Sequence, residues 1–126
     1  MHQTFQKTER LKSKVALEEL ITEGNSAKKH PFVLVWKKVD AQQEFPIRIA
    51  FSVSKKRFPL AVDRNQMKRR ITDIYRVNKA DWYNKLTAHY AILLIYTSNK
   101  KMKTIDLEPK LKSVFKRFIV DAEKVT

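Results

Sequence analysis

The hydrophobic positions divide the chain into segments with helical spacing and segments with strand spacing. The first helical segment begins after Ser13, whose hydroxyl can accept a hydrogen bond from a free amide of the first turn. It ends at Gly24 and Asn25, which tolerate a left-handed backbone. The apolar residues that share one side of this segment are Val15, Leu17, Leu20 and Ile21. The pattern predicts an amphipathic helix.

Two strands are predicted next. The run from Phe32 to Val39 is rich in β-branched and aromatic residues, and the polar turn at residues 40–44 after it predicts a hairpin with the following strand. From residue 47 the pattern alternates strictly, and the apolar face carries Ile47, Ile49, Phe51 and Val53. The opposite face carries Arg48, Ala50, Ser52 and Ser54. Because that second face has little apolar bulk, we expect it to stay open as a groove.

The second half of the chain predicts a helix, a strand and a final helix. Asp63 to Arg76 has a helical period with a basic outer face, and Ala80 to Leu86 can add a short helical turn. Tyr90 to Thr97 is apolar throughout, which is typical of a strand buried on both faces. The last helix is expected from Leu107 to Glu123, with Asp106 as its cap. The predicted order is α-β-β-α-β-α.

Length and composition indicate one folded domain spanning residues 1–126. With 43% apolar residues, one Gly and four Pro, the chain is neither linker-rich nor of low complexity. Residues 1–10 contain no apolar stretch that could serve as a signal peptide, and we expect them to be disordered. The longest apolar run, Tyr90 to Tyr96, is too short to cross a membrane. We therefore expect a cytoplasmic protein with no membrane partner.

The charge balance departs furthest from that of an average protein. Lys and Arg number 27 against 13 Asp and Glu, which gives a formal net charge of +14. Because such an excess opposes compaction through self-repulsion, a polyanion is the natural partner. Between Phe51 and Arg76, eight of 26 residues are basic and two are acidic. A charged helix face is most often simply solvated, but this clustering and the net charge together favour nucleic-acid binding.

The candidate RNA-binding residues follow the second predicted strand and continue along the outer face of the next helix. Backbone amides at the helix N-terminus and the guanidinium of Arg64 can donate charge-assisted hydrogen bonds to phosphate oxygens. Asn65 can cap the helix or contact a ribose or base edge. Arg64 and Lys68 are expected to be exposed. The full set is Lys55, Lys56, Arg57, Arg64, Asn65, Gln66, Lys68, Arg69, Arg70 and Arg76.

This segment resembles the ribonuclease P protein family, in which a strand ending Ser-Val-Ser-Lys-Lys leads into an Arg-Asn-Arg helix. The matching residues are Phe51-Ser52-Val53-Ser54-Lys55-Lys56, Ala61-Val62, Arg64-Asn65, Lys68-Arg69 and Arg76. The resemblance implies an α/β (α+β) two-layer sandwich, with a small mixed sheet packed by helices. It also implies a left-handed β-α-β crossover, which the general handedness rule disfavours.

The resemblance implies an accessory protein subunit of ribonuclease P, an endoribonuclease that removes the 5′ leader of precursor tRNA. The implied partners are the catalytic RNA subunit and precursor tRNA, with no DNA. Chemistry is expected on the RNA subunit together with Mg²⁺, so no cofactor is expected on this chain. One motif position departs from the family, because Gln66 stands where the family has Arg. Gln brings no charge, and we expect Arg57 or Arg70 to compensate.

A second departure concerns the groove that the family uses for the leader. Leu17 and Ile21 stand where family members often have Phe, and aliphatic side chains stack poorly on bases. Phe32 or Trp36 can supply a ring, although large apolar strand residues are more often part of the core. The predicted groove residues are Leu17, Ile21, Phe32, Trp36, Arg48 and Ser52.

A catalytic or metal site on the protein itself is not expected. His2, His30 and His89 have no metal-ligand spacing, and the chain has no Cys. The acidic residues are scattered, and a single Gly excludes a glycine-rich phosphate loop. Two alternatives stay open: a ribosomal or RNA-chaperone protein of similar fold and, ranked last, a self-sufficient nuclease.

Overall fold

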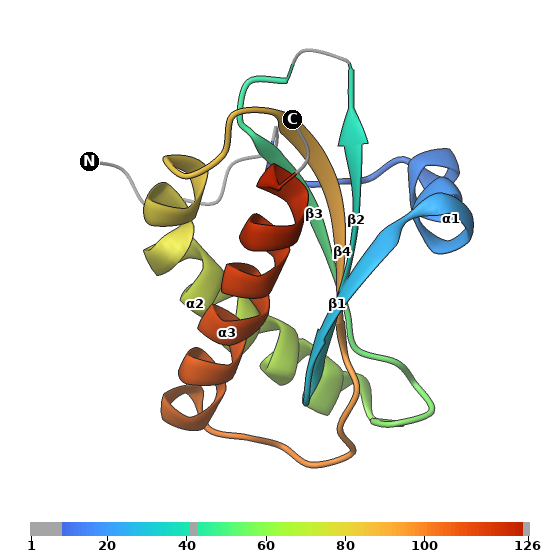
Figure 1. Cartoon of the computed structure of the whole chain (residues 1–126). Helices are drawn as coiled ribbons and strands as arrows, with labels where there is room; N and C mark the ends of the chain where they lie inside the picture. Colours follow the sequence, from blue (N-terminus) through green and yellow to red (C-terminus); the bar gives the residue numbers. More distant parts are fainter. Residues whose placement is uncertain (1–8, 41–42, 125–126) are drawn as a thin grey trace.

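The chain folds into a mixed four-stranded sheet with two helices on one face and a third helix on the other (Figure 1). The computed structural model describes residues 9–40 and 43–124. Its elements are α1 (Lys14–Glu23), β1 (Asn25–Lys29), β2 (Phe32–Val39), β3 (Ile47–Ser52), α2 (Ala61–Tyr83), β4 (His89–Tyr96) and α3 (Thr104–Glu123). The order α-β-β-β-α-β-α confirms the α+β class and adds one strand, β1.

The strand order in the sheet is β1-β2-β4-β3. Strands β1 and β2 form an antiparallel hairpin, β2 is antiparallel to β4, and β3 is parallel to β4. The predicted hairpin between β2 and β3 is therefore wrong, since β4 lies between them. A polar turn between two apolar runs cannot reveal a third strand that inserts from far along the chain. The hand of the β3-α2-β4 crossover stays a prediction.

Strand β1 was not predicted because its sequence does not look like a strand. Its residues, Asn-Ser-Ala-Lys-Lys, are mostly poor strand formers, and only Ala27 is buried. It is an edge strand whose residues pair one by one with β2, from Asn25 opposite Trp36 to Lys29 opposite Phe32. Pairing with a buried neighbour, rather than local propensity, creates this strand.

The predicted start of α1 is confirmed, but the reason given for its end is wrong. Ser13 Oγ accepts a hydrogen bond from the amide of Ala16 at 3.2 Å. Gly24 has a φ of −74°, so no left-handed residue ends the helix. A Cβ at Gly24 would instead overlap the carbonyl oxygen of Leu20 and lie 2.7 Å from Cγ1 of Val35. Glycine is required here for the close approach of α1 to β2.

Both long helices begin earlier than the pattern predicted. Helix α2 starts at Ala61 and continues to Tyr83, so the predicted short turn at residues 80–86 is largely its last turn. Helix α3 starts at Thr104, and the residue before it, Lys103, makes no side-chain cap hydrogen bond. Asp106 therefore lies within the first turn and is not the cap.

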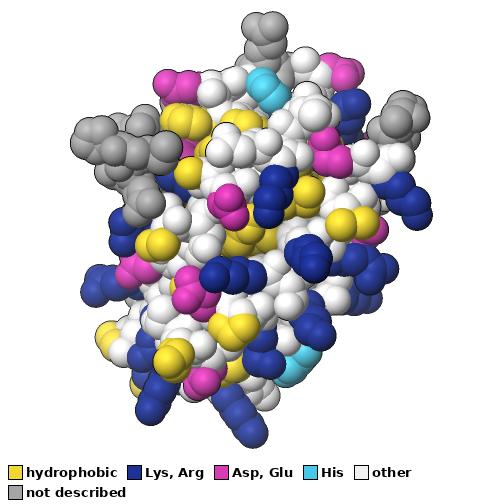
Figure 2. Space-filling view, turned by 60° about the vertical axis from the view of Figure 1, so that its left-hand side comes forward, with side chains coloured by type: hydrophobic (Ala, Val, Ile, Leu, Met, Phe, Trp, Pro, Cys, Tyr) yellow, Lys and Arg dark blue, Asp and Glu magenta, His cyan; other side chains and the backbone are white. Residues whose placement is uncertain are grey.

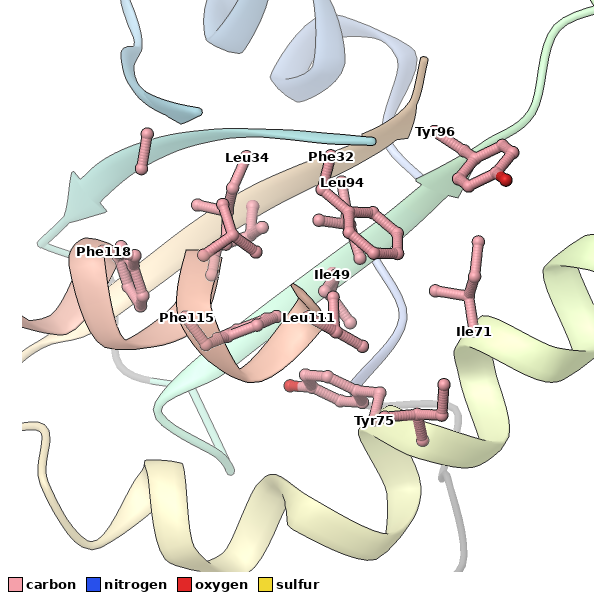
Figure 3. Packing of buried hydrophobic residues seen from close by; sticks show 14 of the residues in the cluster. Phe32, Leu34, Ile49, Ile71, Tyr75, Leu94, Tyr96, Leu111, Phe115 and Phe118 are labelled. Carbon is pink, nitrogen blue, oxygen red and sulfur yellow. The ribbon is translucent and has the colours of Figure 1, made fainter. Parts of the chain in front are cut away.

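The main core lies between the sheet and the two helices α2 and α3. Figure 3 shows side chains of β2, β3 and β4 pointing toward α2 and α3. Within the helical layer, the ring of Trp82 stacks on that of Phe115 with centroids 4.0 Å apart. Phe32 and Trp36 belong to this core, with exposed fractions of 1% and 9%. The prediction that these two rings line the groove is wrong, because they lie on the opposite face of the sheet.

The other face of the sheet is covered only in part. Leu20 of α1 packs on Ala91 and Leu93 of β4, and partly buried neighbours complete this smaller cluster. Those neighbours are Leu11, Leu17, Val35, Val39, Ala50 and Ile95. Helix α1 stands alone on this side in Figure 1, which agrees with the expected open face.

Glu9 and Arg10, at the end of the stretch expected to be disordered, have defined contacts. Residues 1–8 lie outside the described residues, but Glu9 is completely buried, and Arg10 forms a parallel β-bridge with Ile49. The expectation of disorder is therefore wrong for Glu9 and Arg10. In the part of the chain that the structure describes, no helix is long and apolar enough to cross a membrane.

Candidate nucleic-acid interface

The basic turn between β3 and α2 is held to the helix by one side chain. Phe58 inserts into the core and fixes the end of the turn. Arg64 Nη1 donates hydrogen bonds to the carbonyl oxygens of Phe58 at 2.9 Å and Pro59 at 3.0 Å. Three cations of this turn, Lys55, Lys56 and Arg57, are exposed. The turn and the first turns of α2 thus form one connected basic surface.

Arg64 has a structural role that its place in the basic motif does not reveal. It is partly buried rather than exposed, and so is Lys68, so both predictions of exposure are wrong. Asn65 is exposed, but it lies inside α2, and the residue that precedes the helix, Leu60, makes no side-chain cap hydrogen bond. The capping role proposed for Asn65 is therefore wrong, and its side chain is available to a ligand.

A loop between β4 and α3 adds a cation that sequence analysis missed. Lys101 Nζ lies 2.9 Å from Gln66 Oε1 and 2.5 Å from Asp63 Oδ1. A positive charge therefore stands beside the motif position that lacks one, although Asp63 offsets part of it. The sequence does contain a cluster of lysines at 100, 101 and 103, but no neighbouring residue in the chain indicates that this cluster lies next to α2.

The arginines expected to compensate for Gln66 also contact this loop. Arg70 Nη1 donates to the carbonyl oxygen of Met102 at 2.8 Å, and Arg57 Nη1 donates to Asn99 Oδ1 at 3.2 Å. Arg70 is partly buried and Arg57 is exposed. Their hydrogen bonds hold the loop against α2 and the turn. The exposed Arg69 and the partly buried Arg76 complete the predicted set, and Arg76 Nε lies 3.9 Å from Asp73 Oδ1.

Three of the predicted groove residues gather on the face of the sheet that α1 covers in part. Leu17 packs between α1 and the sheet, while Arg48 and Ser52 share the face of β3 that carries Ala50. Ile21 points into solvent from α1, with 69% of it exposed. The open face therefore offers apolar, hydroxyl and guanidinium groups, with no contribution from Phe32 or Trp36.

Positive charge is not confined to this surface. Figure 2 shows Lys and Arg side chains spread widely over the face formed by α2 and α3, with Asp and Glu between them and hydrophobic side chains in the middle. Charge density alone would not locate an interface, so the assignment depends on the geometry of the turn and α2. Among residues 9–40 and 43–124, no group of three or more His, Cys, Asp or Glu is placed to hold a metal ion.

Comparison with known proteins identifies the family. The family model described as Ribonuclease P matches residues 5–119. The ribonuclease P protein component of Chlorobaculum tepidum is 34% identical over 71 residues, which are 54% of this chain and 46%, or about half, of that relative.

Solved structures agree with this match. A ribonuclease P protein of Staphylococcus aureus superposes with a TM-score of 0.72 at 27% identity, covering 86% of this chain and 93% of that one. A ribonuclease P protein of Thermotoga maritima has the same fold, with a TM-score of 0.70 at 24% identity over 86% of this chain and 96% of its own. The chain therefore belongs to the ribonuclease P protein family.

Proposed function

We propose that this chain is the protein subunit of ribonuclease P, which binds the catalytic RNA and the 5′ leader of precursor tRNA and assists removal of that leader. The observation that carries the proposal is the connected basic surface formed by the turn at residues 54–60 and the N-terminal half of α2. Cations held on such a scaffold lose less conformational freedom when they bind phosphates than cations on a flexible loop. The surface therefore suits a folded RNA.

The leader is proposed to lie on the open sheet face beside α1. Arg48 is exposed on β3 and can donate to a phosphate, and the hydroxyl of Ser52 follows it on the same face. Ile21 offers an exposed apolar contact for a base. Because Phe32 and Trp36 lie in the core, the proposal relies on phosphate and apolar contacts in place of ring stacking from these residues.

The chemistry is proposed to take place on the RNA subunit, with Mg²⁺ held there. The contribution of this chain is to neutralise phosphates and to order the RNA that holds the ions. The protein side chains act through binding and positioning and take no part in bond cleavage.

Reconstitution tests the proposal directly. The purified chain is incubated with precursor tRNA in the presence and absence of its cognate catalytic RNA. We expect faster cleavage at low Mg²⁺ when protein and RNA are combined, and none with the protein alone. Cleavage by the protein alone would indicate a self-sufficient nuclease. No enhancement of the RNA-catalysed reaction would favour a ribosomal or chaperone role.

Salt dependence provides a second test. If about six phosphates are contacted, affinity for the catalytic RNA should fall roughly 1000-fold between about 50 and 200 mM salt. A nearly flat response, measured by titration of labelled RNA, would contradict an electrostatic interface.

A further inference from the structure

A buried ion pair anchors the chain just before α1. Glu9 is completely buried, and Lys79 Nζ donates to its two carboxylate oxygens at 2.6 and 2.7 Å. The hydroxyl of Tyr83 donates to Glu9 Oε2 at 2.6 Å, and the hydroxyl of Tyr75 lies 2.9 Å from that of Tyr83. The Glu9 carboxylate is thus held by three hydrogen bonds from α2. A buried ion pair is weak evidence for stability, because desolvation offsets its attraction. What it does here is fix the position of residue 9.

The residues after Glu9 lie along the free edge of the sheet. Strand β3 is an edge strand, and Arg10 bridges to its Ile49 in parallel fashion. The amide of Leu11 donates to the carbonyl oxygen of Ile49 at 2.9 Å, and the Leu11 side chain packs on the smaller apolar cluster. This segment is therefore held at Glu9 by α2 and at Arg10 and Leu11 by Ile49 of β3.

This placement creates a cationic hollow of about 280 Å³ between residues 10–12, β3 and α2. Arg10 and Lys12 line it from the N-terminal segment, and Lys68 lines it from α2. Ala50 and Thr72 contribute to the wall, and among the described lining residues none is acidic. Three cationic residues from two segments line the same hollow, and no carboxylate is among its described lining residues, which favours an anionic ligand.

The hollow connects the two surfaces assigned above. Lys68 belongs to the basic face of α2, and Ala50 belongs to the open sheet face that carries Arg48 and Ser52. An RNA strand that runs from one surface to the other must pass this edge of β3. A phosphate at the hollow would then lie within reach of cations from both segments.

We propose that residues 9–12, anchored by Glu9 on Lys79 and Tyr83, complete a phosphate site in which Arg10, Lys12 and Lys68 bind one RNA backbone phosphate at the edge of β3. The site extends the proposed function, since its ligand is RNA. The phosphate comes either from the precursor leader or from the catalytic RNA, and two arms of the experiment separate these sources. Glu9 acts as a positioning residue that never contacts the RNA.

The test uses the full chain with Lys12→Gln, Glu9→Gln and their combination. Lys116→Gln is the matched control, because it removes the same charge from an exposed position on α3. One arm measures affinity for the catalytic RNA across a salt series. The other arm measures, across the same salt series, the affinity of the reconstituted holoenzyme for precursor tRNA with and without its leader. Thermal unfolding is recorded for every variant.

In one of the two arms, Lys12→Gln is expected to weaken binding and to reduce the slope of log affinity against log salt by about one relative to Lys116→Gln. The arm affected identifies the source of the phosphate. Glu9→Gln should weaken RNA binding in the same arm. Adding Lys12→Gln to Glu9→Gln should weaken it little further, because residues 10–12 are already displaced. If Glu9→Gln does not fold, Tyr83→Phe replaces it, since it removes one of the three hydrogen bonds.

Equal slopes for Lys12→Gln and Lys116→Gln in both arms would overturn the phosphate site. Fully additive effects of Glu9→Gln and Lys12→Gln would overturn the positioning role. Failure of the proposed function is a separate result, because the unmodified chain would then show no salt-dependent RNA binding in either arm.

Discussion

Replacing Arg64 by Ala should lower both stability and RNA affinity, whereas replacing Arg69 should lower RNA affinity alone. Arg64 donates two hydrogen bonds, to Phe58 and Pro59, and the second of these is exposed. A hydrogen bond from a charged donor contributes roughly 1.5–3 kcal/mol to the free energy of unfolding when it is buried. Because both Arg64 hydrogen bonds are at least partly exposed to solvent, we expect them to contribute about 1–2 kcal/mol together. At about 4 °C per kcal/mol for a chain of this size, the melting temperature should fall by about 4–8 °C.

The assay combines thermal unfolding by circular dichroism with titration of labelled catalytic RNA. Arg69→Ala is the matched control, because it removes the same charge from an exposed position on the same helix. Its melting temperature should shift by no more than about 2 °C. Arg64→Lys should keep much of the RNA affinity, because the positive charge remains. It should still lower the melting temperature, because an ammonium group lacks the planar guanidinium geometry of Arg64. A melting temperature for Arg64→Ala equal to that of Arg69→Ala would refute the structural role.

Three further predictions concern the loop, the end of α1 and the tyrosines. Lys101→Met should weaken binding of the catalytic RNA, because it removes the cation beside Gln66. Lys116→Met is the control, and equal affinity of the two variants for the RNA would contradict this prediction. Gly24→Ala should destabilise the fold by about 1–3 kcal/mol in denaturant titration, because the added Cβ would overlap the carbonyl oxygen of Leu20, whereas Ser26→Ala should not. An unchanged midpoint for Gly24→Ala would contradict the close approach of α1 to β2. Burial raises the pKa of all four tyrosines, so their contribution to stability is complete below about pH 10 and is lost as the pH rises further. Tyrosinate absorbance should therefore appear together with loss of the circular dichroism signal, and a rise that precedes unfolding would contradict their burial.

Features that depend on neighbouring residues could be predicted from the sequence. The Ser13 cap, the amphipathic spacing of α2 and α3 and the alternation of β3 follow from periodicity, which does not require knowledge of the rest of the fold. For α1 the predicted apolar side is wrong in part, because Leu20 is buried and Leu17 is partly buried, whereas Val15 and Ile21 are exposed. The basic segment and its resemblance to a family were equally local, and the family match over residues 5–119 confirms that resemblance.

Features that depend on distant contacts could not be predicted. Polar β1 is a strand only because β2 pairs with it, and β4 separates β2 from β3 although it lies far along the chain. Phe32 and Trp36 point toward the face of the sheet that α3 covers. Their apolar side chains alone do not reveal which face of the sheet a helix will cover.

The same division applies to the candidate site. The sequence by itself determined that Lys55 to Arg76 form a basic strand-to-helix segment, because those residues are adjacent or share a helix face. Only the tertiary structure decided that Arg64 binds the preceding turn, that Lys101 stands beside Gln66, and that residue 9 is buried against α2. The physical reason is that a cation's partners are set by packing between segments far apart in the chain, whereas its place on a helix face is set by the helical period.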